Sequence, residues 1–198
     1  EADVLLGTQM VAKGLDFPGV TLVGVISADT GIHLPDFRAS ERTFQLLTQV
    51  SGRAGRGDTP GEVVVQTYLP DGEAVRYAAD HDFLAFAAFE LENRQDVGYP
   101  PFGRMALFLL KGPQEDEVAR AAARCAETLR GQTDDQVEVL GPVPAPLARI
   151  RKTYRWQVIV KAPPPARLNA AARAALSQMG RQAGRVRLDV DVDPVSML

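Results

Sequence analysis

After residue 103, segments with strand periodicity alternate with segments with helix periodicity, and this feature restricts the fold more than any other. Short runs with strand periodicity are separated by two alanine-rich amphipathic stretches, which gives the order βαββαβ. Hydrophobic and polar residues alternate in 155–161 and 187–192, as is typical of a sheet with one wet face. We therefore predict an α+β domain with the ferredoxin-like split-βαβ plan. Its predicted strands are Arg104–Lys111, Gln136–Leu140, Tyr154–Ala162 and Arg185–Asp193, and its predicted helices are Glu115–Leu129 and Ala166–Arg181.

The first 102 residues follow a different pattern. The valine-rich run Val20–Ser27 predicts a parallel strand covered on both faces, and Val4–Gly7 and Glu62–Leu69 predict two more. Ser40 is a candidate N-cap for a helix that ends at the glycine-rich stretch 52–57. This order indicates part of an α/β layer structure. The predicted organisation is half of an α/β lobe over 1–72, a helical connector over 73–102 with an apolar stripe of Phe83, Phe86 and Phe89, and the α+β domain over 103–198.

Composition limits the broad class of protein. At 45% hydrophobic and 24% charged residues, the chain has the composition of a globular domain. No run of residues is long and apolar enough to cross a bilayer, and no signal peptide is evident at the N-terminus. The single cysteine, Cys125, excludes an internal disulfide, and we expect a small buried thiol in a reducing cytoplasm. Because the sequence starts at Glu1 within a strand-turn pattern, we expect it to be a segment of a longer protein.

Charge is distributed unevenly along the chain. The net charge is −3, yet residues 142–198 hold 10 Lys/Arg against 3 Asp/Glu. Such an excess indicates either a phosphate-binding surface or solvated helix faces, and charge alone leaves both open. Tyr154 and Trp156 lie among these cations and either stack on unpaired bases or belong to the core. The candidate DNA-binding residues here are Arg149, Arg151, Lys152 and Arg155.

The strongest chemical motif is a pair of arginines, Arg53 and Arg56, set among glycines at the end of a predicted helix. Their spacing places both guanidinium groups on one side of the helix. Two such groups suit a triphosphate, on which negative charge grows during phosphoryl transfer. The alternative is a pair of cations that caps the helix C-terminus, and local chemistry leaves both interpretations open.

This stretch, 49–57, resembles motif VI of DNA and RNA helicases, and 7–18 resembles their motif V. Further segments are similar to the PriA family of primosomal helicases and follow the order of that family. They are DFRASER at 36–42, YPP at 99–101, LGPVPAP at 140–146, YRWQ at 154–157 and LDVDVDP at 188–194.

The resemblance implies that residues 1–72 belong to the second RecA-like lobe of a helicase and complete an ATP site on the first lobe. Arg53 and Arg56 would be catalytic and contact the β- and γ-phosphates. The other residues implied are Gln49, Gly52, Gly14 and Asp16 for nucleotide binding and coupling, and Thr8 and Gln9 for the DNA backbone.

The resemblance also implies the activity of the whole protein: ATP-dependent 3′–5′ unwinding and replication restart at branched forks by primosome assembly. ATP with Mg and a structural zinc would be held by parts outside this chain, which contains no Walker A sequence, and we expect the chain alone to be inactive. The implied partners are branched and single-stranded DNA, the single-stranded-DNA-binding protein, other primosome proteins and the replicative helicase, in the nucleoid-associated cytoplasm and without a membrane. A fork-binding and loading scaffold with little or no ATPase activity stays open as the alternative.

The remaining polar residues suggest no chemistry. His33 and His81 lie far apart in the sequence and lack a partner motif, so we expect no catalysis by either. Asp189, Asp191 and Asp193 alternate along a predicted strand. Exposed edge charges or pairs with nearby arginines explain them better than a cation site, and no metal ligand is predicted in this chain.

Overall fold

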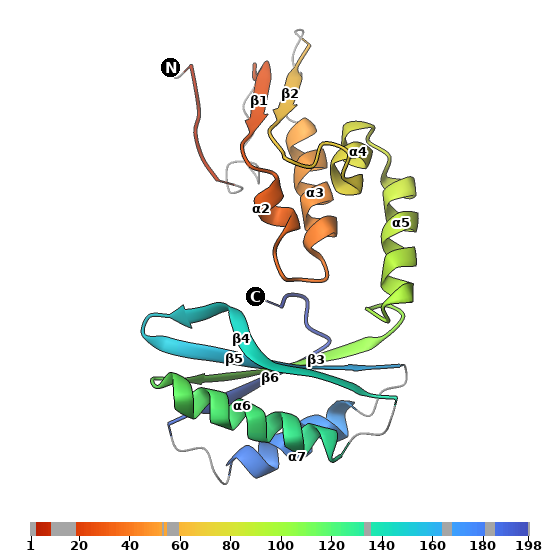
Figure 1. Cartoon of the computed structure of the whole chain (residues 1–198). Coiled ribbons are helices and arrows are strands. Elements are labelled where there is room, and N and C mark those ends of the chain that lie inside the picture. The colour runs from red at the N-terminus through yellow and green to blue at the C-terminus, as the bar shows by residue number, and fades with distance from the viewer. Residues whose placement is uncertain are drawn as a thin grey trace. The chain divides into compact units, whose positions relative to one another are not determined.

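The computed structural model describes residues 3–8, 19–52, 54, 60–132, 136–163, 168–180 and 185–197. The chain divides into two compact units, Glu1–Glu90 and Leu91–Leu198. Each unit combines helices with a sheet, which confirms the mixed α/β class (Figure 1). The finer division into 1–72, 73–102 and 103–198 stays a prediction.

The N-terminal unit is built on a short parallel strand pair. Strand β1 (Leu22–Val25) lies beside β2 (Glu62–Val65), with Val23 opposite Val63. The valine-rich composition predicted both strands, although each is shorter than expected and shows an exposed face. The helices of this part are α2 (Asp29–Ile32), α3 (Ala39–Ser51), α4 (Glu73–Ala79) and α5 (Phe83–Asp96), whose last turns belong to the second unit.

Aromatic packing forms the core of the N-terminal unit. The ring of Phe44 on α3 stacks on that of Phe86 on α5, with centroids 4.1 Å apart and planes 3° apart. Leu47 and Val50, which follow Phe44 at helical spacing in the sequence, are buried on the same side of α3. The predicted stripe on α5 is only partly correct, because Phe83 is 63% exposed.

Two local predictions for this unit are wrong. In the described segment 3–8, Val4–Gly7 forms no strand and the side chain of Val4 is 83% exposed, since a buried strand requires a paired neighbour. Ser40 is not the N-cap of α3, because the helix begins at Ala39, two residues earlier than a Ser40 cap implies, and Arg38 occupies the cap position. Ser40 therefore lies inside the first turn.

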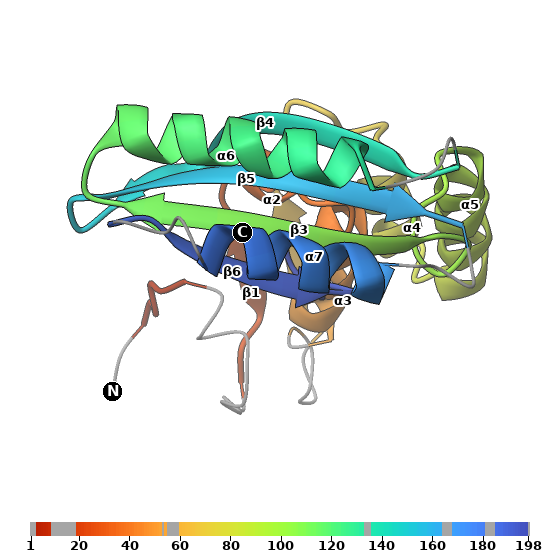
Figure 2. The same ribbon diagram turned by 90° about the horizontal axis from the view of Figure 1, so that it is seen from below.

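The C-terminal unit is a four-stranded antiparallel sheet with two helices on one face. The strands lie in the order β4-β5-β3-β6, and every neighbouring pair is antiparallel. Figures 1 and 2 show both helices against the same side of the sheet. The elements are β3 (Arg104–Gly112), α6 (Glu115–Arg130), β4 (Glu138–Ile150), β5 (Thr153–Ala162), α7 (Leu168–Gly180) and β6 (Arg187–Val192).

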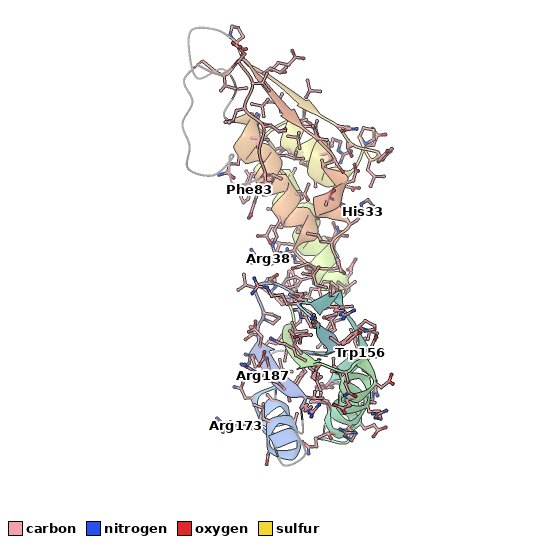
Figure 3. All side chains as sticks on the ribbon, turned by 90° about the vertical axis from the view of Figure 1, so that its left-hand side faces the viewer. His33, Arg38, Phe83, Trp156, Arg173 and Arg187 are labelled. Atoms are coloured by element: carbon pink, nitrogen blue, oxygen red, sulfur yellow. The ribbon has the colours of Figure 1, made fainter. Side chains whose placement is uncertain are left out.

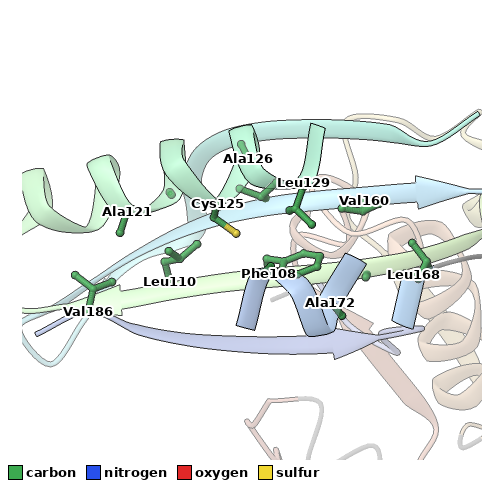
Figure 4. Close-up of a cluster of buried hydrophobic side chains, with 14 of the residues drawn as sticks. Phe108, Leu110, Ala121, Cys125, Ala126, Leu129, Val160, Leu168, Ala172 and Val186 are labelled. Atoms are coloured by element: carbon green, nitrogen blue, oxygen red, sulfur yellow. The ribbon is translucent and has the colours of Figure 1, made fainter. Parts of the chain in front are cut away.

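The core of this unit lies between the sheet and the helices. Phe108 and Leu110 of β3 point toward the helices and are completely buried (Figure 4). Alanines along α6, among them Ala122, let the helix approach the sheet closely, and Leu129 fills the end of the layer. For β5 and β6 the alternation in the sequence therefore predicted correctly which side packs against the helices.

Strand β4 departs most from its predicted range. It continues from Glu138 to Ile150, well past the predicted end at Leu140, and its register against β5 shifts twice. At Gly141 the backbone has a φ of +93°, and an added Cβ would lie 2.9 Å from the carbonyl oxygen of Gln157. Only glycine adopts this conformation without strain and leaves room for the neighbouring strand.

The buried thiol of Cys125 gives a simple test of this packing. Cys125 lies on the sheet-facing side of α6, and burial raises its pKa to about 11. Because the thiolate is the reactive form, we expect the native chain to react with an aromatic disulfide reagent at about pH 8 far more slowly than the unfolded chain. The absorbance of the aromatic thiolate that the reagent releases measures both rates. Equal rates for the native and the unfolded chain would show that α6 is not packed as described.

Candidate nucleotide site and nucleic-acid interface

Helix α3 carries the described part of the motif that resembles helicase motif VI. Gln49 lies in its last turn with an exposed side chain. Gly52 ends the helix, and its N–H donates to the carbonyl oxygen of Thr48 at 3.2 Å. Thr8 is exposed in the described segment 3–8. The predicted residues Gln9, Gly14, Asp16, Arg53 and Arg56 lie outside the described residues.

Ion pairs fix the opposite end of α3. Arg42 donates to the buried carboxylate of Asp36 at 2.9 Å. Arg38, which is labelled in Figure 3, binds Glu41 with two hydrogen bonds of 3.0 and 2.6 Å, and these raise the pKa of its guanidinium group. These pairs hold the first turn of the helix in the absence of a described side-chain cap, so the DFRASER segment has a clear structural role.

A buried carboxylate joins the ends of the two parallel strands. Asp29, which follows β1, accepts hydrogen bonds from the Thr67 hydroxyl at 2.7 Å and from the Tyr68 N–H at 3.1 Å. The hydroxyl of Thr67 contributes most to holding the pKa of Asp29 below its usual value. The ring of His33 contacts the main-chain oxygen of Asp29 at 2.9 Å, which gives this histidine a structural contact.

The candidate DNA residues of the C-terminal unit surround the tip of the β4–β5 hairpin. Ile150 pairs with Thr153, so Arg151 and Lys152 form a two-residue turn. Their φ angles are +46° and +68°, which are the signs required at both central positions of a type I′ turn. Both side chains are exposed. The hairpin therefore presents two adjacent cations at its tip.

The other two predicted cations, Arg149 and Arg155, lie on opposite faces of the sheet. Tyr154 packs against the core beneath the helices, and the guanidinium carbon of Arg149 lies 4.8 Å from the centre of its ring. Arg155 follows Tyr154 in the strand and so points to the opposite face. There its Nη1 donates to the carbonyl oxygen of Leu147 at 3.3 Å. Residues 149–155 are thus not one contiguous surface.

Two cations that no sequence motif indicated lie in line with Arg155 on the next two strands of the sheet. Lys111 of β3 is opposite Arg155 of β5 and also opposite Arg187 of β6. Their alternation places all three on the sheet face away from α6 and α7. No local sequence signal connects them, because they come from three strands that are far apart in the chain. We call Arg155, Lys111 and Arg187 the cation row.

Tyr154 and Trp156 belong to the core. Both pack against the buried cluster between sheet and helices, on the side opposite the cation row. The interpretation of these aromatic residues as core residues therefore holds, and they are not placed to stack on bases at that row.

Two of the three aspartates of β6 and its end, Asp189 and Asp193, are paired as expected, and Asp191 is exposed. Lys111 and Arg187 contact Asp189 and hold the pKa of its carboxyl below the usual value. Arg104 pairs with Asp193, with the same effect on the pKa of Asp193. Within the described ranges no group of three or more His, Cys, Asp or Glu side chains is placed to hold a metal ion.

None of the helices among the described residues is long and apolar enough to span a membrane.

Comparison with known proteins identifies the relatives of the chain. The chain is 42% identical, over its whole length, to the replication restart protein PriA of Bacillus subtilis and 43% identical to that of Synechocystis. It covers 25% and 23% of those two proteins, about a quarter of their length. The Haemophilus influenzae protein of the same name is 38% identical over 98% of the chain.

The family comparison covers the second unit almost completely. Residues 95–195 match the family described as the primosomal protein N C-terminal domain. This match includes all four strands of the antiparallel sheet and both of its helices. The chain therefore belongs to the PriA family, as a member that carries the primosomal protein N C-terminal domain.

Proposed function

We propose that this chain is the ATP-coupling and fork-binding part of an ATP-dependent 3′–5′ DNA helicase that restarts replication by primosome assembly. The observation that carries the proposal is unbroken similarity, over the whole chain, to proteins named replication restart protein PriA. The similarity includes both the motif-bearing N-terminal unit and the C-terminal sheet. A similarity confined to the sheet would support only a shared accessory domain.

The architecture supports a finer assignment of the two units. A parallel strand pair with α3 beside it is the arrangement expected of part of a RecA-like lobe. The order β4-β5-β3-β6 with antiparallel neighbours is the arrangement expected of a ferredoxin-like domain. Because of the parallel strand pair, we assign the N-terminal unit to the second helicase lobe. Because of the antiparallel strand order, we assign the C-terminal unit to the ferredoxin-like class.

ATP with Mg would bind on a first lobe outside this chain. Arg53 and Arg56 would approach its β- and γ-phosphates from the end of α3, and Gln49 and Gly52 would support them. Cations aimed at the transferring phosphoryl group stabilise the charge that grows on it. Gly14 and Asp16 would couple the nucleotide state to DNA held by Thr8 and Gln9. A structural zinc would also be held outside this chain.

The C-terminal unit would bind the DNA. Exposed cations at the tip of the β4–β5 hairpin supply the salt-dependent attraction to phosphate that does not depend on base sequence. Such binding suits a protein that recognises the branched shape of a fork and not its sequence. Branched and single-stranded DNA, the single-stranded-DNA-binding protein, other primosome proteins and the replicative helicase are the partners we propose for the whole protein.

The hairpin tip allows a test that leaves the fold intact. In the variant Arg151→Asn/Lys152→Gly, two residues with positive φ become the Asn-Gly pair that a type I′ turn favours. We expect the dissociation constant for labelled fork DNA to rise roughly 10-fold at ~0.1 M salt, because two phosphate contacts are lost. Fluorescence anisotropy over a salt series measures this change.

The melting temperature serves as the control for this variant. We expect it to be unchanged or slightly higher, since the new turn carries no backbone strain. Fork binding that stays the same in affinity and in salt dependence would remove the hairpin tip from the proposal. Failure of the unsubstituted chain to bind fork DNA would refute its fork-binding role.

A further inference from the structure

The face of the C-terminal sheet opposite α6 and α7 has an uneven distribution of charge. At the far end from the hairpin tip, a cation of this face has an acidic partner, since Lys161 lies 3.0 Å from Glu138. The cation row at the hairpin end differs. Among the described residues Asp189 is its one carboxylate, at 2.5 Å from Lys111 and 2.8 Å from Arg187. The row therefore carries two more positive than negative charges.

This excess is unfavourable for the sheet itself. Lys111 lies directly between Arg155 and Arg187 in register, and like charges on neighbouring strands repel each other. Strands are about 4.8 Å apart, so the row extends over roughly 10 Å. Asp189 relieves the repulsion only in part, since Arg155 donates to the neutral carbonyl of Leu147. An anion that extends along the row would relieve the rest.

The position of the row indicates which anion fits. Arg155 lies two residues beyond Thr153, where the hairpin tip with Arg151 and Lys152 ends. The row thus begins on β5 close to the end of the hairpin tip, so that one extended polyanion can contact both the tip and the row. Guanidinium groups bind phosphate with two parallel hydrogen bonds. The aromatic residues of β5 point to the other face, so the row is built for a charged backbone and not for stacked bases.

We propose that the cation row of Arg155, Lys111 and Arg187 binds the phosphate backbone of nucleic acid and continues the contact made by the hairpin tip. The inference rests on the proposed fork-binding function and adds Lys111 and Arg187 as binding residues. Asp189 has a second role in this arrangement. It holds Lys111 and Arg187 in place, and it also competes with phosphate for them.

The test compares variants of equal charge in the whole chain. In Lys111→Gln/Arg187→Gln, we expect the dissociation constant for labelled fork DNA to rise roughly 10-fold or more at ~0.1 M salt. The slope of log affinity against log salt should fall by about one to two. The matched control is Arg120→Gln/Arg124→Gln, which removes two exposed cations from α6 on the other side of the sheet. We expect less than about a twofold change in the control.

A further variant separates binding from folding. Asp189→Asn removes the competing carboxylate, so we expect it to tighten fork binding several-fold, which damage to the fold would not do. Arg187→Gln alone also tests the row safely, because this side chain is 80% exposed. Equal weakening in the α6 control, or tighter binding absent in Asp189→Asn, would overturn the proposal.

The failure of this inference can be told apart from failure of the proposed function. One outcome is that the chain binds fork DNA while the Lys111 and Arg187 variants bind it with the same affinity and the same salt dependence. In that case the cation row does not bind DNA, and the proposed fork-binding function stands. If the unsubstituted chain binds no fork DNA, both are wrong.

Discussion

Phe108→Ala is expected to lower the free energy of unfolding of the C-terminal unit by about 3–5 kcal/mol. Phe108 is 0% exposed and lies in the middle strand pair, beneath α6 and α7. Its removal leaves a cavity that a layer of alanines and β-branched residues cannot close, because both helices are already in close contact with the sheet. Most of a small domain's stability would be lost in one substitution.

Trp156 makes this measurement specific to one unit. It is the single tryptophan of the sequence and packs against the same core cluster as Phe108. Its fluorescence during denaturant unfolding therefore reports on the C-terminal unit. Leu147→Ala is the control, since this side chain is 52% exposed and should change stability by less than about 0.5 kcal/mol. A change of similar size in both variants would show that Phe108 is not in the core.

The second large effect concerns ATP hydrolysis. In a protein that joins this segment to a first lobe with Walker motifs, we expect Arg56→Ala to lower the DNA-stimulated kcat by about 10³-fold or more. The loss would arise because the guanidinium group stabilises the negative charge that grows on the transferring phosphoryl group. Arg56→Lys should restore little of the activity, since an ammonium group lacks the planar fork.

The controls for this experiment separate the two interpretations of the family. Arg120→Ala removes an exposed arginine from α6 and should leave kcat unchanged. A less than threefold effect of Arg56→Ala would exclude this arginine from the chemistry. If the unsubstituted protein hydrolyses no ATP with DNA present, the scaffold interpretation is correct, and fork binding by the C-terminal unit becomes the main activity.

Elements whose signals are local were predictable from the sequence. Helix α6 begins at Glu115 as predicted, because acidic residues in the first turn and regularly spaced apolar residues are both short-range features. The burial of Phe44 and Leu47 on α3 follows from helical periodicity in the same way. The order of the motifs in the sequence was also sufficient to identify the family.

Features that depend on contacts between distant residues were not predictable. The cation row requires the register of three strands, and pairing of Lys111 with Arg187 spans most of the C-terminal unit. Ser40 had the right chemistry for a cap, but the helix starts two residues earlier, where Arg38 pairs with Glu41. The full length of β4 was missed because its prolines predict a break, whereas an edge strand tolerates them.

Those prolines also determine how the sheet can associate with other chains. Pro142, Pro144 and Pro146 stand at alternate positions of β4, which is an edge strand among the strands that the structure describes. Proline has no N–H to donate, so an incoming strand would find a row of missing donors along this edge. Growth of the sheet by added strands is thus blocked at β4, and β6 deters it with alternating charges. The unit can therefore reach a high local concentration without its sheets joining edge to edge.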